Sequence, residues 1–564
     1  MKRYFLITAL MLLVVLSNAQ ISTKQLPRSF FLKEKVGLVT KTLSSPDIDA
    51  LLEEDDNNAN FFKAQRCAVA VPMFENFFDN AVRTSFENYD LYTLKVTIPY
   101  AYAIGFSSND FYLPKGTELY LYNPEHSKVL GAYTSDNNAE NGIFATEYVY
   151  GDEIIIEYYQ PKTIIESAKI ELSEFVYFYR DVTYIEQEQM LKSEPQFSTK
   201  EFRESGSCNV NINCSEGDNY QDVKNAVMRI QIRGGYNYYW CTGTLINTTN
   251  YSKEPYIISA AHCVQYSSTS NYSYFVFYFN YEAPGCTTPS YGSEPSYVSY
   301  TGCTFLAKDS SNGDNGTDYL LVKLNNNFTS SHNPYFAGWL RSSTAPNSGV
   351  CIHHPSGDIK KISSFTAQPT SAEAYNSTHW RVYWAQTTNG FGIVEGGSSG
   401  SGLFNTDGRL VGTLTGGYSD CGYISSPSME KDWYGRFDLQ FSNLSQWLDA
   451  TGTGATTVEG IYFNQAVDTL STDTIPSAIN TIEASMGFVV YPSIANDYIN
   501  ISSNIANTNV VVVVLNEIGQ SVLSYTIPAN QSNTSINISS LKDGVYFVRF
   551  YANGNSYIQK IIKQ

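Results

Sequence analysis

The 564-residue sequence is long enough for several domains, and only 16% of its residues are charged, whereas tyrosine alone occurs 44 times. This composition favours β-rich folds over helical ones. The formal net charge of −18 argues against a nucleic-acid-binding protein and fits an acidic extracellular one.

Residues 1–19 have the three parts of a signal peptide. Lys2 and Arg3 provide the positive start, residues 5–16 the apolar centre, and residues 17–19 a small-residue cleavage site. The apolar run is too short to span a membrane, and no later stretch is a convincing transmembrane helix. Export predicts an oxidising environment, so the nine cysteines are interpreted as disulfides rather than as metal ligands.

Residues 20–200 contain one cysteine, Cys67, and no catalytic constellation. Alternating apolar runs at 91–98, 118–122 and 153–159 predict strands. The segment Leu-Pro-Lys-Gly-Thr-Glu-Leu-Tyr-Leu-Tyr (113–122) resembles part of the pro-regions of bacterial lysyl endopeptidases. By that resemblance, residues 20–200 form a β-rich propeptide that assists folding and inhibits the enzyme. The alternative is an accessory β-sandwich that stays attached.

Three motifs within residues 201–455 together predict a serine nucleophile. Ser399 lies in Gly-Gly-Ser-Ser-Gly, which suits a tight turn whose backbone amides point at one spot. His262, in Ala-Ala-His-Cys, would take the serine proton, and Asp318, directly ahead of an apolar run, would hold the imidazole tautomer. Asp314 is a nearby alternative to Asp318. The order His, Asp, Ser is that of chymotrypsin and differs from that of subtilisins and α/β-hydrolases.

From Ser205 to about Asp449 the chain resembles a bacterial lysyl endopeptidase. The matching pieces are Ser-Gly-Ser-Cys208, Cys241-Thr-Gly-Thr-Leu-Ile-Asn, Ala-His262-Cys263, Asp318-Tyr-Leu-Leu, Ile-His-His-Pro355, Gly-Ser-Ser399-Gly-Ser and Tyr-Gly-Arg436. The resemblance implies a mainly β protein with a chymotrypsin-like double β-barrel. Apolar residues at helical spacing in 441–449 match the closing helix of the family.

The same resemblance implies three disulfides, which are Cys208–Cys421, Cys214–Cys286 and Cys241–Cys263. Cys303 and Cys351 lie outside the family pattern, each at the edge of a strand-like run. A fourth bridge between them is the simplest expectation. Cys67 would then be a free thiol.

The backbone N–H groups of Gly397 and Ser399 are expected to stabilise the oxyanion of the tetrahedral intermediate.

The strand that pairs with substrate backbone is assigned to Leu-Thr415-Gly416-Gly417, where Thr415 replaces a pocket-edge histidine of the family. Asp432 matches the lysine-binding aspartate of the family, across an insertion after Cys421; the alternatives are Asp420 and Asp438. Tyr375 is the nearest candidate for the family's stacking tryptophan. Basic specificity is predicted, and strict preference for lysine is left open.

No metal or cofactor is expected. The loop 312–318 resembles a calcium loop, but it lacks the downstream glutamate of an EF-hand. The pair His353-His354 occurs in the family without a metal, and adjacent strand residues point to opposite faces, so both are interpreted as structural. Ser398 stands where trypsins have the aspartate that binds a new N-terminal amine, so removal of the propeptide is the expected route of activation.

Residues 456–485, rich in Thr, Ser, Asp and Pro, have linker composition. Beyond them, strand-like runs at 488–491, 498–501, 510–515 and 545–550 predict a β-sandwich over 486–564. This tail resembles the C-terminal sorting domain of the type IX secretion system, through Val-Tyr-Pro492, Asn-Glu-Ile-Gly-Gln520, Leu-Lys-Asp-Gly-Val-Tyr-Phe547 and the ending Lys-Ile-Ile-Lys563. A carbohydrate-binding β-sandwich is the alternative.

The sequence therefore predicts a secreted or surface-bound monomeric serine endopeptidase that cuts proteins or peptides after lysine, with arginine left open. Its expected partners are its own propeptide and the type IX secretion machinery. Lys200 precedes the protease motifs, so such an enzyme could free its own mature N-terminus at Glu201. The rival hypothesis is a catalytically silent, protease-like adhesin.

Overall fold

The computed structural model describes residues 25–33, 36–57, 64–180, 205–289, 295–311, 316–371, 377–423, 431–465 and 488–564, the last with short gaps at 492–493, 504–509, 517–520, 530, 532 and 553–554. It forms two compact units, Met1–Val467 and Asp468–Gln564. Below, residues 25–180 are the N-terminal region, 205–465 the central region and 488–564 the C-terminal tail. The expected signal peptide, Lys200, Glu201, Asp314 and Tyr375 lie outside the described residues.

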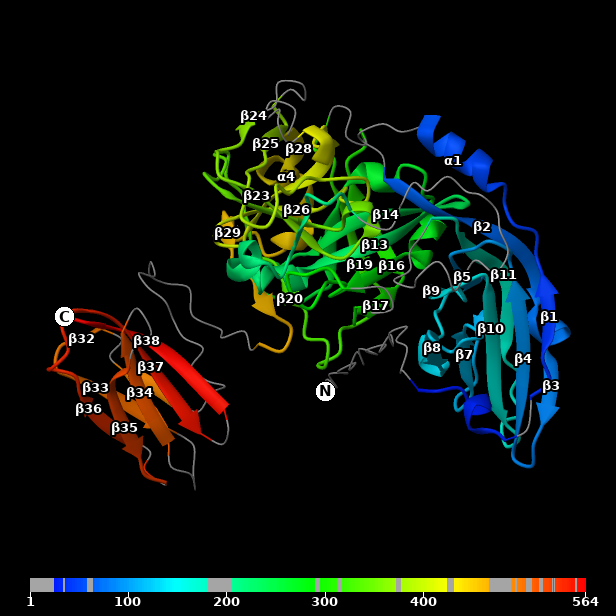
Figure 1. Cartoon of the computed structure of the whole chain (residues 1–564), viewed down its shortest axis with the longest axis horizontal. Helices are drawn as coiled ribbons and strands as arrows, with labels where there is room; N and C mark the ends of the chain where they lie inside the picture. The colour runs from blue at the N-terminus through cyan, green and yellow to red at the C-terminus, as the bar shows by residue number, and fades with distance from the viewer. Residues whose placement is uncertain are drawn as a thin grey trace, which may run out of the picture. The chain divides into compact units, whose positions relative to one another are not determined.

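The N-terminal region is a two-layered β-structure with a core of its own (Figure 1). One layer has the order β1-β4-β10-β7-β8, with β3 on β4. Its strands are β1 (Val39–Thr42), β3 (Val82–Ser85), β4 (Tyr89–Thr97), β7 (Glu118–Tyr122), β8 (Val129–Tyr133) and β10 (Glu153–Pro161). The other layer contains β2 (Gln65–Asn76), β5 (Ala103–Ser108), β6 (Phe111–Tyr112), β9 (Phe144–Tyr150) and β11 (Lys169–Phe178). The helices are α1 (Ile48–Asn57) and α2 (Phe77–Asn80).

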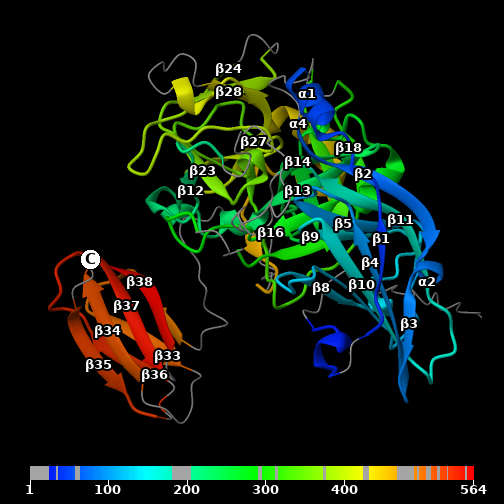
Figure 2. The same cartoon turned by 45° about the vertical axis from the view of Figure 1, so that its right-hand side comes forward.

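The second layer continues into the central region, because β2 pairs antiparallel with β14 (Asn237–Leu245). The resulting sheet has twelve strands within the described residues. Its central-region members are β13 (Val227–Gly234), β14, β15 (Tyr256–Ser259), β16 (Val276–Phe279), β17 (Val298–Thr301), β18 (Cys303–Lys308) and β19 (Leu320–Leu324). These seven strands are the first half of the central region. Figure 2 shows β5 and β9 of the N-terminal region beside β13 and β16.

Alternation along β13 explains how this sheet is buried on both faces. Met228, Ile230 and Ile232 point into the core of the first half. Arg229, from the opposite face, donates from Nη2 to the Tyr148 hydroxyl of the N-terminal region at 3.0 Å and is only 1% exposed. Side chains that alternate out of a one-sided sheet usually meet water, so the N-terminal region covers what would be an exposed face.

The second half of the central region is a further barrel-like sheet, ordered β12-β23-β22-β26-β27-β28-β25-β24, with β21 and β29 at one side. The strands are β12 (Val210–Asn211), β21 (Trp339–Leu340), β22 (Gly349–His353), β23 (Lys361–Phe365), β24 (Thr370–Ser371), β25 (His379–Tyr383), β26 (Gly402–Asn405), β27 (Leu410–Gly417), β28 (Lys431–Arg436) and β29 (Thr457–Val458). The short strands β20 (Tyr335–Phe336) and β30 (Ile461–Tyr462) pair with each other. Helix α4 (Phe437–Leu448) buries Phe437, Phe441, Leu444 and Leu448, so the closing helix begins four residues before the predicted start.

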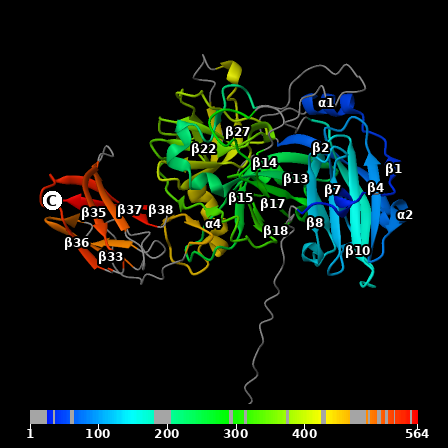
Figure 3. The same cartoon turned by 60° about the horizontal axis from the view of Figure 1, so that its bottom comes forward.

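The C-terminal tail is a β-sandwich around aliphatic residues such as Val512, Val514 and Val548. One sheet is β31-β33-β36 and the other β32-β38-β37-β34-β35. Figure 3 shows β33 and β36 of the first sheet and β35, β37 and β38 of the second. The strands are β31 (Phe488–Tyr491), β32 (Ile494–Ala495), β33 (Tyr498–Ser503), β34 (Val510–Asn516), β35 (Ser521–Ile527), β36 (Asn533–Asn537), β37 (Gly544–Ala552) and β38 (Asn555–Lys563). The mainly β class, the barrel-like sheets and the C-terminal β-domain are confirmed. None of the helices in the described part of the chain is long and apolar enough to cross a membrane.

The three disulfides implied by the resemblance are present as Cys208–Cys421, Cys214–Cys286 and Cys241–Cys263. The predicted fourth bridge is wrong, because Cys303 and Cys351 are both free and lie in different cores. The Cys303 thiol faces the Tyr272 carbonyl at 3.5 Å, and the Cys351 thiol lies 3.2 Å from Ser401 Oγ. Cys67 is a free buried thiol, as expected.

Candidate active site

His262 and Asp318 meet at the edge of the first half. His262 follows β15 in a short 3₁₀ turn, and Asp318 lies two residues before β19, which pairs with β15. Asp318 Oδ2 lies 2.7 Å from His262 Nδ1, and Oδ1 accepts the His262 backbone N–H at 2.9 Å. Both side chains are almost fully buried. This double contact holds the imidazole with Nδ1 toward the carboxylate.

Two further residues, which the sequence patterns did not single out, fix the backbone of Asp318. Asp309 Oδ2 accepts the backbone N–H groups of Thr317 and of Asp318, the latter at 2.8 Å. Gln440, on α4, donates from Nε2 to the Thr317 carbonyl and to Thr413 Oγ1, each at 2.8 Å. Asp318 has a φ of 50°, which is uncommon outside glycine, so these contacts hold a backbone conformation that costs free energy.

The loop that carries Ser399 packs directly against the strands around His262. The Ser399 carbonyl accepts the Thr242 N–H of β14 at 2.9 Å, and Cys263 Sγ lies 3.8 Å from the same oxygen. Gly400 has a φ of 84°, and a Cβ there would lie 2.1 Å from Ser259 Oγ. Glycine is therefore required at this position, and its absence of a side chain brings Ser399 next to the histidine turn.

Residues of the His353–His354 pair support the same loop. Thr242 Oγ1 donates to the Gly397 carbonyl at 2.9 Å and accepts the His354 N–H at 3.1 Å. Ser398 Oγ lies 2.8 Å from His353 Nδ1. Burial lowers the pKa of His353 to about 3, so this histidine is neutral at physiological pH and serves as a hydrogen-bonding support. Both histidines therefore contribute to the hydrogen bonds that support the loop carrying Ser399.

The free groups of this site suit general-base catalysis. His262 Nε2 is buried and has no hydrogen-bond partner among the described residues. The backbone N–H groups of Gly397 and Ser399 have no acceptor within the same part of the chain. An unoccupied ring nitrogen can accept a serine proton, and two unoccupied amides can donate to a developing oxyanion.

Asp432 lies on β28 opposite Gly417 of β27, at the end of the strand assigned to substrate. Its side chain is fully buried. The carboxylate accepts hydrogen bonds from Trp384 Nε1 and from Ser419 Oγ, the latter at 2.6 Å. Asp420 is exposed and Asp438 pairs with Arg436 at 2.7 Å, so Asp432 is the buried carboxylate of the three. Trp384 was not foreseen from the sequence.

Thr415 is buried on β27 and contacts a histidine that the sequence patterns also missed. His379 Nε2, on β25, lies 2.9 Å from Thr415 Oγ1, and its Nδ1 lies 2.9 Å from Thr378 Oγ1. Burial lowers the pKa of His379 to about 4, partly offset by the charges of Asp318 and Asp309. A neutral imidazole therefore stands behind the strand that holds Thr415, Gly416 and Gly417. The described residues contain no group of three or more His, Cys, Asp or Glu side chains placed to hold a metal ion.

Comparison with known proteins supports both resemblances. Residues 202–435 match the family described as lysyl endopeptidase, C-terminal domain, and residues 489–564 match the secretion system C-terminal sorting domain. A lysyl endopeptidase of Pseudomonas aeruginosa is 31% identical over an alignment of 265 residues that covers 44% of this chain and 53% of that protein. The chain thus spans about half the length of this curated relative. The sorting-domain match confirms the expected export to the cell surface or the medium.

Solved structures similar to this chain include serine proteases. The protease Anisep from Arthrobacter nicotinovorans is 17% identical with a TM-score of 0.29, covering 43% of this chain and 99% of that one. The thermostable serine protease AL20, from an extremophilic microorganism, is 14% identical with a TM-score of 0.27, covering 41% and 99%.

Proposed function

We propose that this chain, whose central region matches lysyl endopeptidases and whose tail matches a secretion sorting domain, is a secreted serine endopeptidase that cuts after lysine. Ser399 is the nucleophile, His262 the general base, and Asp318 the residue that orients the imidazole. The N–H groups of Gly397 and Ser399 stabilise the oxyanion. Arginine is a second accepted residue if the pocket is wide enough for its guanidinium.

The observation that carries the proposal is the arrangement of His262, Asp318 and the Ser399 loop. The serine is on a loop packed against the histidine turn, and the free His262 Nε2 lies on the ring side opposite Asp318. On binding, Ser399 Oγ loses its proton to Nε2 as it attacks the carbonyl carbon, and Nε2 then returns the proton to the leaving amine. Asp318 stays ionised and stabilises the imidazolium.

The proposed substrate site lies beside this loop. The backbone of β27 at Thr415–Gly417 pairs with substrate, and Asp432, hydrogen-bonded to Trp384 and Ser419, receives the ammonium of the lysine side chain. A buried carboxylate attracts a cationic side chain more strongly than a neutral one, because opposite charges interact strongly where water is excluded.

The N-terminal region acts as the inhibitor in this proposal. Its strand β2 begins at Gln65, which pairs with Trp240 in the shared sheet. A Cβ on Gly396 would lie only 3.1 Å from Gln65 Cβ, so the N-terminal region touches the nucleophile loop three residues before Ser399. A chain held there restricts access to the loop. Its removal after a cut in residues 181–204 would open the site.

Mass spectrometry of peptides from a denatured protein substrate tests the function. The mature enzyme should leave lysine, or lysine and arginine, before each scissile bond. The Ser399→Ala protein is the matched control and should yield no such peptides. Cleavage after apolar residues would overturn the assigned pocket, and no cleavage by a correctly folded mature enzyme would overturn the assigned activity.

A further inference from the structure

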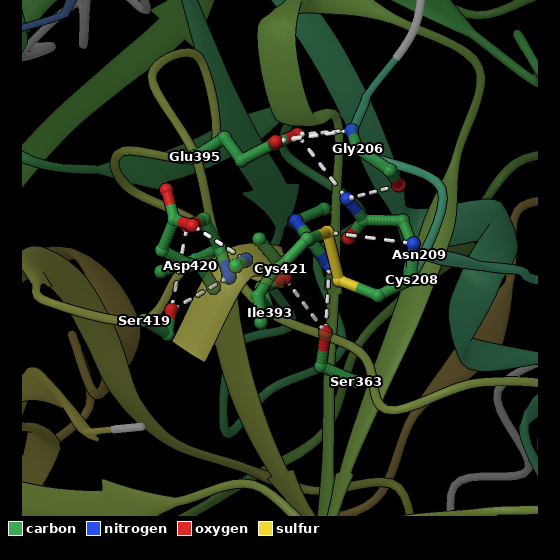
Figure 4. The surroundings of a disulfide bond; sticks show 12 residues. Gly206, Cys208, Asn209, Ser363, Ile393, Glu395, Ser419, Asp420 and Cys421 are labelled. Carbon is green, nitrogen blue, oxygen red and sulfur yellow. Dashed lines mark hydrogen bonds between the residues drawn. A yellow bond between two sulfur atoms is a disulfide. The ribbon is translucent and has the colours of Figure 1, made fainter. Parts of the chain in front are cut away.

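Glu395 begins the loop that ends at Ser399, and its carboxylate points toward Gly206 and Asn209 (Figure 4). Oε1 and Oε2 accept the Gly206 backbone N–H at 3.0 and 3.2 Å. Oε2 also accepts from Asn209 Nδ2 at 3.2 Å. The two partners are more than 180 residues away in sequence, so this contact joins the start of the central region to the nucleophile loop.

Residues 205–209 are themselves fixed in place. Cys208 is bonded to Cys421, and the Cys208 carbonyl accepts the Gly392 N–H at 2.9 Å. Ser205 donates from its backbone N and from Oγ to Asp358 Oδ2, at 3.1 and 3.0 Å. The Glu395 carboxylate therefore binds a rigid anchor. Its donors are a backbone amide and a side chain, so the contact needs no newly formed N-terminal amine.

Glu395 also closes the turn that leads to the nucleophile. Its N–H donates to Ser398 Oγ at 3.2 Å, and its carbonyl accepts the Ser398 N–H at 3.0 Å. The orientation of this turn sets the directions of the Gly397 and Ser399 amides, because these lie within and directly after it. A shift of Glu395 would turn both amides away from the position of an oxyanion.

We infer that Glu395 is a positioning residue for the proposed reaction, which fixes the nucleophile loop by binding the anchor at Gly206 and Asn209. This inference rests on the proposed function. Glu395 touches neither substrate nor reacting atoms; it acts through the backbone of residues 396–399.

The charge of Glu395 gives the contact a pH dependence. The pKa of this carboxyl is raised to about 7, chiefly by burial and also by the nearby Asp358 and Asp420, against the lowering effects of the Gly206 N–H and Lys361. The carboxylate accepts from both donors with full strength, whereas a protonated carboxyl is a weaker acceptor. Protonation of Glu395 should therefore lower wild-type activity in acid.

The test is Glu395→Gln in the mature enzyme, assayed with a lysyl ester and with a fluorophosphonate that labels the nucleophile. We expect kcat to fall by about tenfold to a hundredfold, the cost of a misplaced catalytic group, with a smaller change in KM. The acid limb of the pH–rate profile should lose steepness, because the protonation of Glu395 no longer contributes to it. Asn209→Ala, which removes one donor, should act in the same direction with a smaller effect.

Glu216→Gln is the matched control, since Glu216 also accepts a distant backbone N–H, from Asn389 at 3.0 Å, but is not on the nucleophile loop. It should leave the rate and the pH profile unchanged. If Glu395→Gln, or Asn209→Ala where the first variant fails to fold, keeps both the wild-type labelling rate and the wild-type acid limb, the inference is wrong. If wild-type enzyme is not labelled at all, the proposed function fails instead.

Discussion

The β-sheets of the two halves of the central region are formed from different sets of strands. The first half, which holds His262 and Asp318, shares its sheet with the N-terminal region through β2 and β14. The second half, which holds Asp432 and the Ser399 loop, has a sheet formed by its own strands within the described residues. The proposed base and the proposed nucleophile therefore lie in two halves, of which only the first shares its sheet with the N-terminal region. We expect loss of that region to open the site without disturbing the second half.

The interface between the N-terminal region and the first half resembles a protein interior. Arg229 is buried among three rings of the central region, those of Trp240, Tyr278 and Tyr281, with Cζ 4.2, 4.3 and 3.9 Å from their centroids. From there it donates across the interface to the Tyr148 hydroxyl at 3.0 Å. Glu174 of β11 pairs with Arg233 at 2.8 Å. Paired charges and aromatic rings of this kind are typical of tight association, so a cut in residues 181–204 is expected to leave the two parts bound.

Replacing Ser399, the proposed nucleophile in the second half, should have the largest effect. Ser399→Ala is expected to lower kcat on a lysyl substrate by about a millionfold, as loss of a serine nucleophile does elsewhere. The thermal unfolding midpoint should change little, because Ser399 contacts Thr242 and Cys263 through its backbone carbonyl, which the substitution keeps. Active-site labelling followed by peptide mapping checks the position. A fluorophosphonate found on Ser401 would contradict it.

Asp318→Asn tests the contribution of the first half. An amide cannot stabilise the imidazolium and favours the wrong imidazole tautomer, so kcat should fall by about ten thousandfold. The effect should be smaller than that of Ser399→Ala. Asp309→Asn, which leaves the imidazole contact intact, is the control and should cost far less. Equal losses for the two aspartates would show that the backbone conformation, and not the carboxylate of Asp318, is what matters.

Asp432→Asn should alter specificity in the second half and leave the chemistry intact. Losing one partner of a buried ion pair costs about 3–5 kcal/mol, so kcat/KM on lysyl substrates should fall by roughly two to four orders of magnitude. Labelling of Ser399 by a small fluorophosphonate should barely change. Asp438→Asn is the matched control. Undiminished cleavage after lysine by Asp432→Asn would exclude this aspartate as the lysine-binding group.

Glu174→Gln should weaken the interface between the N-terminal region and the first half. It leaves Arg233 without its carboxylate partner, which costs about 2–5 kcal/mol at buried charge pairs, or roughly 30-fold to several thousandfold in the dissociation constant. When the protein cleaved in residues 181–204 is diluted, the N-terminal region should dissociate from the variant at a higher protein concentration than from wild type. Activity should therefore appear at that higher concentration. Glu171→Gln is the control, since Glu171 lies on the same strand and binds Ser173. Equal effects of the two variants would refute the role of the ion pair.

A stability measurement sharpens the assignment of Glu395 in the second half. The folded-state pKa of about 7 is above the ordinary value of 4.5, so the folded protein holds this proton more strongly than the unfolded chain does. Ionisation of Glu395 therefore lowers the free energy of unfolding as pH rises from about 4.5 to about 7. Between these pH values the melting temperature of Glu395→Gln should rise relative to wild type. A difference in melting temperature that stays constant between these pH values would show that the pKa of Glu395 is not raised.

The sequence predicted those residues of the site that lie within short sequence motifs. His262, Asp318 and Ser399 each stand in a short motif beside a strand, and the structure brings the first two within hydrogen-bonding distance. The disulfide between Cys303 and Cys351 was predicted because these two cysteines were left over from the family pattern. That reasoning does not consider the hydrophobic core into which each cysteine packs. The contacts of Glu395 with Gly206, and of His379 with Thr415, join segments that only the fold brings together. The pairing of β2 with β14 could not be predicted from the sequence either, because backbone hydrogen bonds between edge strands do not depend on residue type.

Removing the C-terminal tail should have the smallest effect on catalysis. Deletion of residues 486–564 takes away a compact unit with its own aliphatic core, whereas the core of the central region is formed by residues before 468. kcat/KM of the mature enzyme and its thermal unfolding should therefore stay within about twofold and about 1 °C of the full chain, since units with separate cores contribute independently to stability. Export should be lost, because the deleted residues match the secretion sorting domain. The measurement is protease activity in the periplasmic fraction and in the medium. A truncated chain that still reaches the medium would refute the sorting role, and one that loses activity in every fraction would show that the central region depends on the tail.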